Sequence, residues 1–329
     1  MRGEEKTVLG PDFSLARPPA VCYNSSVLLA IILLIPKTCR GSRAVLREFF
    51  QRLRGGQAAE LVGYSALGVI RQGSMSTVFK GRDRKTRRLV AIKIHKPEAR
   101  KAVERLESRH RDFTEGQITR AFDHPNVIKC LDHGNLAGND YVIMEYLEGV
   151  TLASLMSGKS RRLNGKRLSY LHQAASGLAH VHAKRFVHHD FCAKNLFVTN
   201  EDRVKLIDFG LTLPLLDLPA VRSRVGTAEI LAPELLRREP CDHRIDIFAW
   251  GVVAYELFAG QWPFESSEHH QVLNKILNVQ PVSLDRRAPN VPQEVAHLVM
   301  RCLEKDPDQR LSSMNTAVGV LERHLNTPA

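Results

Sequence analysis

Closely spaced cysteine pairs are missing from this sequence. The 329 residues include six cysteines, none in a Cys-x-x-Cys pair and all far apart along the chain: Cys22, Cys39, Cys130, Cys192, Cys241 and Cys302. Structural zinc sites and disulfide frameworks depend on cysteines at short, repeated spacings. We therefore expect reduced thiols and a cytoplasmic location.

Long hydrophobic runs are missing as well. The unbroken apolar run 27–35 stops at Pro36, well short of the roughly 20 residues that a membrane-spanning helix needs. No basic segment directly precedes it and no cleavage pattern follows, so a secretory signal is not indicated. Residues 43–54 mix apolar residues with arginines, as in a basic amphipathic helix. We expect this extension to pack on the rest of the protein or to be partly disordered; peripheral membrane contact through residues 27–54 is the alternative.

Acidic residues are the minority among the charged ones. The chain has 47 Lys and Arg against 35 Asp and Glu, a formal net charge of +12. The basic residues gather at 82–88, 161–167 and 222–238. Such clusters are most often solvated surface, and the alternatives are an acidic protein substrate or an anionic membrane. Aromatic residues make up only 6% and are not interleaved with the basic ones, so we expect no nucleic acid partner.

The most informative segment present is 187–195, which reads Val-His-His-Asp-Phe-Cys-Ala-Lys-Asn, followed by Asp-Phe-Gly at 208–210. Asp190 can orient and deprotonate a hydroxyl nucleophile. Asn195 and Asp208 supply the hard oxygen ligands that hold Mg²⁺ on a nucleotide triphosphate. Two acids and an amide at this spacing indicate phosphoryl transfer.

Further motifs occur in order along the chain: Val-Ala-Ile-Lys at 90–93, Ala-Pro-Glu at 232–234 and Asp-Ile-Phe-Ala-Trp-Gly at 246–251. From about residue 64 to about residue 325, the chain resembles the protein kinase family. The resemblance implies an α+β, bilobal protein kinase fold. Residues 64–144 would form a small lobe, an antiparallel sheet plus one helix, 145–149 the hinge and 150–325 a mainly helical large lobe. Residues 1–63 would be an N-terminal extension.

The resemblance implies that Lys93 binds the nucleotide phosphates and needs a carboxylate partner. The downstream candidates are Glu98, Glu104, Glu107 and Glu115. We favour Glu115 because it lies nine residues before His124 and within the predicted helix 111–122. Thr119 stands where relatives usually place an apolar side chain against the Phe of the Asp-Phe-Gly turn.

The resemblance also implies an ATP pocket, with Met144 as the gatekeeper and the backbone of Glu145 and Leu147 bonding adenine. Their side chains would then be free to vary. The implied nucleotide-binding residues are Ile70, Gly73, Val78, Ala91, Lys93, Met144, Glu145, Leu147 and Phe197.

The family's glycine-rich loop, GxGxxGxV, keeps one of its three glycines. Within residues 69–80 only Gly73 remains, and Arg71 and Ser76 occupy the other two positions. Glycines there let backbone N–H groups approach the phosphates and let the loop flex. We expect a stiffer loop in which Arg71 points outward into solvent; a direct contact with phosphate is the alternative.

Two departures lie beside the predicted catalytic aspartate. His189 replaces the arginine that in many relatives pairs with a phosphorylated activation loop, so we expect activity to depend little on phosphorylation of Ser223. Cys192 replaces a lysine usual in serine/threonine kinases, while Lys194 resembles the arginine placement of many tyrosine kinases. Residues 226–234 resemble the serine/threonine form, which we favour.

The resemblance implies an active protein kinase that uses ATP with Mg²⁺, or Mn²⁺, and phosphorylates protein substrates. Its implied catalytic residues are Asp190, Lys93, Glu115 and Asn195, and its implied metal ligands are Asn195 and Asp208. Glu234 and Arg310 match the family's buried ion pair. The alternative is a pseudokinase, a nucleotide-responsive scaffold, which the departures above favour. A tyrosine or dual-specificity kinase is less favoured, and the Ala-Pro-Glu motif disfavours a small-molecule kinase.

Overall fold

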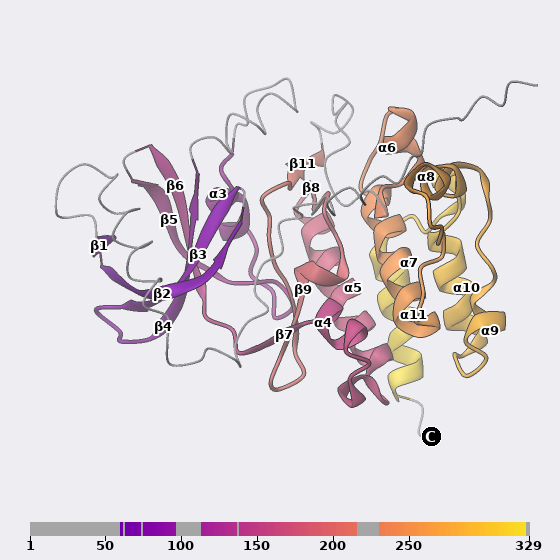
Figure 1. Cartoon of the computed structure of the whole chain (residues 1–329), viewed down its shortest axis with the longest axis horizontal. Helices are drawn as coiled ribbons and strands as arrows, with labels where there is room; N and C mark the ends of the chain where they lie inside the picture. Colours follow the sequence, from indigo (N-terminus) through magenta and orange to yellow (C-terminus); the bar gives the residue numbers. More distant parts are fainter. Residues whose placement is uncertain are drawn as a thin grey trace, which may run out of the picture.

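The computed structural model describes residues 60–61, 63–73, 75–96, 113–136, 138–215 and 230–326. The predictions for residues 1–59, for Glu98, Glu104 and Glu107, and for Ser223 lie outside these residues. Within them the chain forms two lobes, one built around a sheet and one mainly helical (Figure 1). The α+β, bilobal architecture is confirmed.

The small lobe contains β1 (Glu60–Leu61), β2 (Tyr64–Gln72), β3 (Ser76–Asp83), β4 (Leu89–His95), α3 (Glu115–Arg120), β5 (Cys130–Leu136) and β6 (Asn139–Glu145). Its antiparallel sheet has the strand order β1-β2-β3-β4-β6-β5, and α3 packs against β5 and β6. Side chains alternate between the two faces of β4, as the period of two in a strand requires. Ile92 is buried in a small cluster on one face, while Ala91 belongs to the large core and Lys93 projects on the same side as Ala91.

Helix α3 begins later than predicted. Thr114 caps it: the Thr114 hydroxyl accepts a hydrogen bond from the Gln117 N–H at 3.3 Å, and the Gln117 side chain accepts one from the Thr114 N–H at 2.8 Å. This capping box ends the non-helical segment at Thr114. The predicted helix 111–122 is therefore too long at both ends, since Phe113 is not helical and Ala121 is the C-cap. Glu115 becomes the first helical residue.

The large lobe begins with β7 (Gly149–Thr151), α4 (Leu152–Ser157), the 3₁₀ turn η1 (Arg161–Leu163), α5 (Arg167–Ala183), β8 (Phe186–Val187), η2 (Ala193–Asn195), β9 (Leu196–Thr199), β10 (Val204–Leu206) and β11 (Leu213–Pro214). It continues with α6 (Pro233–Arg237), α7 (Arg244–Ala259), α8 (His269–Asn278), α9 (Leu284–Arg287), α10 (Gln293–Cys302), η5 (Pro307–Gln309) and α11 (Met314–Asn326). Strands β7, β9 and β10 form a small antiparallel sheet, and β8 pairs with β11.

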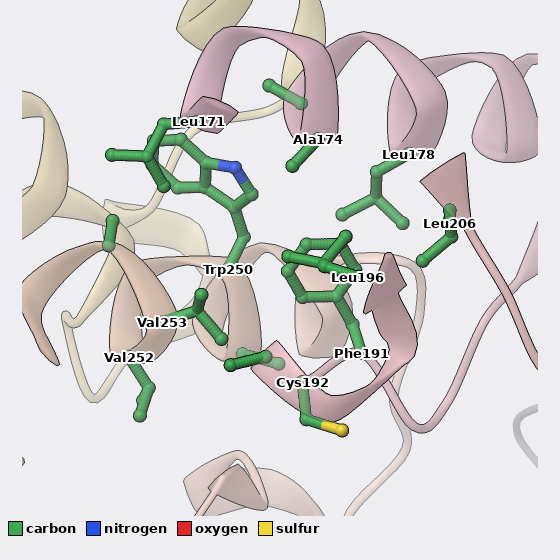
Figure 2. Packing of buried hydrophobic residues seen from close by; sticks show 14 of the residues in the cluster. Leu171, Ala174, Leu178, Phe191, Cys192, Leu196, Leu206, Trp250, Val252 and Val253 are labelled. Carbon is green, nitrogen blue, oxygen red and sulfur yellow. The ribbon is translucent and has the colours of Figure 1, made fainter. Parts of the chain in front are cut away.

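Helix α7 runs through the middle of the large lobe. It is apolar around nearly its whole circumference, as a helix enclosed on all sides should be. Figure 2 shows Trp250 of α7 extending toward Leu171 and Ala174 of α5, with Phe191 in the same cluster. Gly251 lets α10 come close, because a Cβ there would lie 2.7 Å from Cys302 Cβ. This core fixes the segment that contains Phe191 and, next to it, Asp190.

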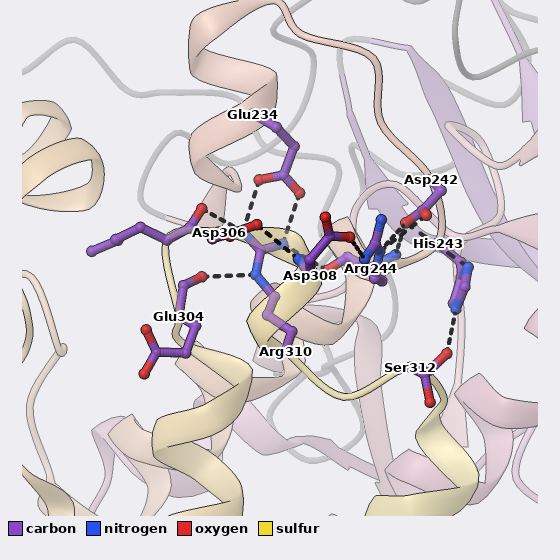
Figure 3. A network of polar contacts seen from close by, with 10 residues as sticks. Glu234, Asp242, His243, Arg244, Glu304, Asp306, Asp308, Arg310 and Ser312 are labelled. Atoms are coloured by element: carbon purple, nitrogen blue, oxygen red, sulfur yellow. Dashed lines mark hydrogen bonds and ion pairs between the residues drawn. The ribbon is translucent and has the colours of Figure 1, made fainter.

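The predicted ion pair between Glu234 and Arg310 is present and almost fully buried (Figure 3). Arg310 Nη1 and Nη2 donate to the two Glu234 carboxylate oxygens at 2.7 and 2.8 Å. Arg310 Nε donates to the Glu304 carbonyl at 2.8 Å. The pair ties α6 to the segment that follows α10.

Part of the basic cluster at 161–167 has a structural role. Arg162 Nε lies 2.9 Å from Asp202 Oδ1, and Lys166 also binds the Asp202 carboxylate. These contacts join the turn before α5 to the β9–β10 hairpin. None of the helices within the described ranges is both long and apolar enough to cross a membrane.

Candidate active site

Lys93 lies where the two lobes meet and has only 3% of its surface exposed. Its Nζ donates to both carboxylate oxygens of Glu115, at 2.8 and 2.7 Å, and to Asp208 Oδ1 at 2.8 Å. Burial alone lowers the pKa of Lys93, but the charges of Asp208 and Glu115 outweigh it and the pKa is raised. The lysine is therefore held as a cation between a small-lobe helix and the Asp-Phe-Gly turn.

Glu115 is the glutamate that the structure brings to Lys93. Burial opposes its ionisation, but Lys93 and then His95 lower the pKa of its carboxyl well below the ordinary range. As the first residue of α3, Glu115 also has its charge at the positive end of the helix. The choice of Glu115 from its position in the sequence agrees with this contact.

Asp190 and Asn195 lie on one short segment that ends in η2. Asn195 Nδ2 donates to the Asp190 carbonyl and to Asp190 Oδ2, both at 2.9 Å. Both side chains are buried. The amide therefore fixes the rotamer of the carboxylate, and orienting a carboxylate in advance is what phosphoryl transfer requires of it.

The turn at Asp208 is constrained by its surroundings. Asp208 has φ +64°, a left-handed conformation uncommon for residues other than glycine, and the Gly210 N–H donates to Asp208 Oδ1 at 3.2 Å. A Cβ at Gly210 would lie 3.1 Å from Asp208 Oδ1 and 3.3 Å from Glu115 Oε2. Glycine at 210 leaves room for the carboxylates around Lys93.

Two buried oxygens at this site fit a divalent cation. Asn195 Oδ1 and Asp208 Oδ2 are enclosed and accept no hydrogen bond from any residue in the described ranges. Carboxylate and amide oxygens are the ligands that Mg²⁺ prefers, together with waters and phosphates. In the same part of the chain no cluster of three His, Cys, Asp or Glu side chains suits a metal. These two protein oxygens would suit a hard cation whose other ligands are phosphate oxygens and waters.

Several of the predicted nucleotide-binding residues belong to the large core. They are Val78, Ala91, Met144, Leu147 and Phe197, and Ile70 packs against this core. Glu145 ends β6. Its side chain was expected to be free to vary, but it makes two hydrogen bonds within the protein. Its Oε1 accepts hydrogen bonds from the Lys129 N–H at 2.9 Å and from Lys205 Nζ at 2.6 Å. Glu145 thereby links the predicted hinge to β10.

Thr119 does not disturb the packing of Phe209. The Thr119 hydroxyl is satisfied inside α3, because it donates to the Glu115 carbonyl at 2.7 Å. The Phe209 ring instead contacts Phe122, with ring centroids 5.0 Å apart, and His188, at 5.1 Å. A cluster of three rings in tilted and edge-to-face contact thus joins the residue after the C-cap of α3, the Asp-Phe-Gly turn and the segment before Asp190.

Asp246 of α7 binds the backbone of the segment before Asp190. Its carboxylate accepts the N–H of His188 at 2.7 Å and the N–H of His189 at 2.9 Å, and it contacts His182 Nε2 at 2.9 Å. His189 has φ +67°, a conformation that these bonds support. Burial lowers the pKa of His188, so that imidazole is neutral. The two histidines therefore belong to the scaffold of the segment.

Cys192 is buried, with 6% of its surface exposed. Burial, and then the charge of Asp190, raise the pKa of its thiol. Since the thiolate is the reactive form, this cysteine is a poor nucleophile.

The residues at the remnant of the glycine-rich loop are held by local hydrogen bonds. The Gly73 N–H donates to the Ser76 carbonyl at 2.8 Å. Lys96 Nζ donates to the Gly73 carbonyl at 2.6 Å, and the Lys96 N–H donates to the Met75 carbonyl at 3.0 Å. This agrees with a loop stiffer than a three-glycine loop. Arg71, however, is half-buried and lies on the Lys93 face of the sheet, so the prediction of an outward side chain is wrong.

Sequence reasoning missed His95. Its Nε2 lies 3.0 Å from Glu115 Oε2, so Glu115 is flanked by Lys93 and His95 from the same strand. The alternation of side chains in β4 places His95 on the Lys93 face, and this signal could have found it. What the alternation could not give is the position of α3 against that face.

The fold and this arrangement of lysine, glutamate, aspartates and asparagine define the class of protein: a two-lobed kinase. The chain belongs to the protein kinase family, since the model of the protein kinase domain matches residues 64–320.

Similar proteins include bacterial and plant serine/threonine-protein kinases. PrkC of Bacillus subtilis is 30% identical over 249 residues, 75% of this chain and 38% of the relative. PknA of Corynebacterium glutamicum is 31% identical over 265 residues, 78% of this chain and 55% of the relative. Serine/threonine-protein kinase 1 of Arabidopsis thaliana is 31% identical over 252 residues, 75% of this chain and 29% of the relative. The chain thus spans between 29% and 55% of the length of these relatives.

Proposed function

We propose that this chain is an ATP-dependent protein kinase that transfers the γ-phosphate to serine and threonine hydroxyls of protein substrates. The observation that carries the proposal is the contact of Lys93 Nζ with both Glu115 and Asp208. This contact requires α3, β4 and the Asp-Phe-Gly turn to be in place at once. A kinase site needs the same three elements together for transfer.

Each side chain at the site would have a separate role in phosphate transfer. Asp190, oriented by Asn195 Nδ2, would accept the hydrogen bond of the substrate hydroxyl and aim it at the phosphate. Lys93, kept charged and positioned by Glu115, would bind the phosphates. Asn195 Oδ1 and Asp208 Oδ2 would hold Mg²⁺, or Mn²⁺, which neutralises phosphate charge when bound.

The adenine ring would lie among the apolar side chains of the large core. Ile70, Val78, Ala91, Met144 and Phe197 would enclose it. Backbone groups of Glu145 and Leu147 would supply its hydrogen bonds, and Gly73 would lie near the phosphates. The kinase domain would comprise residues 64–325, after an extension of residues 1–63.

Serine and threonine are favoured as acceptors because the three relatives named above are serine/threonine-protein kinases. The net charge of +12 favours acidic substrates.

We place the protein in the cytoplasm, with contact of residues 27–54 with a membrane surface as a less favoured addition. Because His189 replaces an arginine, activity should depend little on phosphorylation of Ser223.

The proposal is tested by phosphate transfer from γ-labelled ATP to the protein itself and to a generic acceptor. Wild type and Asp190→Asn are compared, followed by phosphoamino-acid analysis. We expect phosphoserine and phosphothreonine from wild type and a loss of at least about 100-fold in the variant, about 2.7 kcal/mol of barrier. Background signal from both proteins with Mg²⁺ and with Mn²⁺ would reject catalysis, and phosphotyrosine alone would reject the acceptor class.

A pseudokinase scaffold is the second candidate, and the buried Cys192 thiol favours it. A neutral thiol stands where relatives usually place a cation against the transferring phosphate, and burial raises its pKa further. A scaffold would still bind nucleotide. It would show ATP-dependent stabilisation without transfer, which separates it from the enzyme in the experiment above.

A further inference from the structure

A β-bulge turns Arg71 toward the Lys93 face of the sheet. Val69 of β2 pairs with Phe79 of β3, but Arg71 pairs with Val78, so the register shifts between Val69 and Arg71. A bulge places one extra residue in a strand, and side chains that directly oppose one another share a face. The extra residue here is Ile70. Arg71 therefore lies on the same face as Val78.

That face is the one that carries the phosphate-binding candidate. Val78 pairs with Lys93 of β4, so Arg71, Val78 and Lys93 form one row across three neighbouring strands. The two faces are also distinguished by packing. Val78 and Ile70 pack in the large core, whereas Val69 and Phe79 pack in the small cluster on the opposite side.

The electrostatic surroundings of Arg71 agree with this placement. Its side chain is half-buried, and burial lowers the pKa of its guanidinium. The charge of Asp208 acts in the opposite direction. Asp208 is a predicted metal ligand in the large lobe. Because its charge acts on the pKa of Arg71, the guanidinium lies within electrostatic range of the Asp208 carboxylate.

One backbone donor of the remaining loop is already engaged. Two of the family's three glycines are replaced, by Arg71 and Ser76. The N–H of the remaining glycine, Gly73, is used within the loop, because it donates to the Ser76 carbonyl at 2.8 Å. Lys96 Nζ is likewise engaged with the Gly73 carbonyl at 2.6 Å. Arg71 is the cation beside this loop that the bulge directs to the Lys93 face.

We propose that Arg71 binds the phosphates of the bound nucleotide, replacing with a guanidinium the backbone donors that a glycine-rich loop supplies. A guanidinium offers five N–H donors in a planar fork that matches phosphate oxygens, and it is always charged. Lys93 and Arg71 hold the phosphates from two strands of one sheet face. This assignment rests on the proposed function only in taking ATP as the nucleotide.

The test is nucleotide binding by the full chain, measured by isothermal titration with adenosine, AMP, ADP and ATP in the presence of Mg²⁺. Wild type is compared with Arg71→Ala, Arg71→Gly and Arg71→Lys. The matched control is Arg88→Ala, an exposed arginine in the turn between β3 and β4. Thermal unfolding without nucleotide checks that each variant is folded.

We expect Arg71→Ala and Arg71→Gly to weaken ATP binding about tenfold, about 1.4 kcal/mol, and adenosine binding by less than about twofold. The loss should grow with the number of phosphates. Arg71→Lys should retain part of the affinity, and Arg88→Ala should bind like wild type.

Equal ATP affinity in wild type and Arg71→Ala, tighter binding by Arg71→Gly, or equal losses for adenosine and ATP would overturn the assignment. A wild-type chain that binds no nucleotide would overturn it together with the proposed function. Phosphate-dependent losses in a chain that transfers no phosphate would support Arg71 and reject only the proposed enzyme.

Discussion

At the residue scale, the chain keeps charges in places where isolated charges would be costly. Lys93, Glu115 and Asp208 are all buried, and each has an opposite charge within 2.8 Å. Pairs of this kind offset the cost of burial only when the geometry is good, so they contribute little net stability. They fix positions, which is what phosphoryl transfer needs.

Glu256 is a half-buried acidic residue with no such partner at close range among the ion pairs described above. Burial raises the pKa of its carboxyl to about 7, although the charge of Lys194 acts to lower it. An unfolded chain would titrate this group near pH 4.3. Between those two values the folded state binds more protons than the unfolded state, so ionisation of Glu256 lowers the free energy of unfolding as the pH rises.

We therefore predict that Glu256→Gln raises the melting temperature at pH 8, by about 2 °C, and that the gain shrinks toward pH 5. The partly exposed carboxylate is screened by solvent, which keeps the effect below about 1 kcal/mol. Thermal unfolding at both pH values measures it. Glu322→Gln on the exposed side of α11 is the matched control and should change neither value. A gain for Glu256→Gln that is the same at pH 5 and pH 8 would contradict this explanation.

At the element scale, the buried ion pair between Glu234 and Arg310 holds several elements of the large lobe together. Arg310 binds both oxygens of Glu234 and also donates to the carbonyls of Glu304 and Arg244. Its guanidinium lies 4.9 Å from the centroid of the Phe248 ring in α7. A single side chain thus connects α6, α7 and the segment after α10.

Removing that side chain should leave Glu234 as an uncompensated buried charge. We predict that Arg310→Met lowers the free energy of unfolding by about 3–5 kcal/mol, measured by urea denaturation. Arg323→Met is the control, because its pair with Glu294 is largely exposed and should contribute less than about 1 kcal/mol. Similar losses in the two variants would show that burial does not decide the cost.

The elements that sequence predicts best are those with a strong local pattern. The Val-Ala-Ile-Lys motif lies within β4, and the Ala-Pro-Glu motif lies at the start of α6. The start of α3 was missed because Thr114 and Gln117 cap it mutually, and the spacing of apolar residues does not register a cap. The bulge before Arg71 was missed because register depends on which residues of β3 pair with β2. Both misses concern pairwise contacts.

The candidate site was predicted further than the fold details. Lys93 and Asp208 could be chosen from motif order and Glu115 from its spacing to His124, and the structure brings the three together. The contacts of His95 with Glu115 and of Lys205 with Glu145 were not found, because each joins elements whose proximity only the folded chain establishes. Motifs in the sequence therefore predict the candidate catalytic residues, whereas the contacts that support these residues depend on how the elements pack.

At the scale of the whole molecule, two ion pairs are among the contacts that join the two lobes. The Lys93 contact with Asp208 joins β4 of the small lobe to the turn after β10. Glu145 at the end of β6 binds Lys205 of β10. Strand β10 and the turn after it are thus held to the small lobe at two places. The central claim is that this junction is assembled for metal-dependent transfer.

The most direct test of that claim is the initial rate of transfer from γ-labelled ATP to a serine peptide with Mg²⁺, for wild type and Asp208→Asn. Asp123→Asn, a change at an exposed carboxylate, is the matched control. We predict that wild type and the control transfer phosphate at similar rates, while Asp208→Asn is slower by at least about 100-fold, as expected for loss of a charged ligand at a phosphoryl-transfer site. Equal rates for wild type and Asp208→Asn would contradict the account.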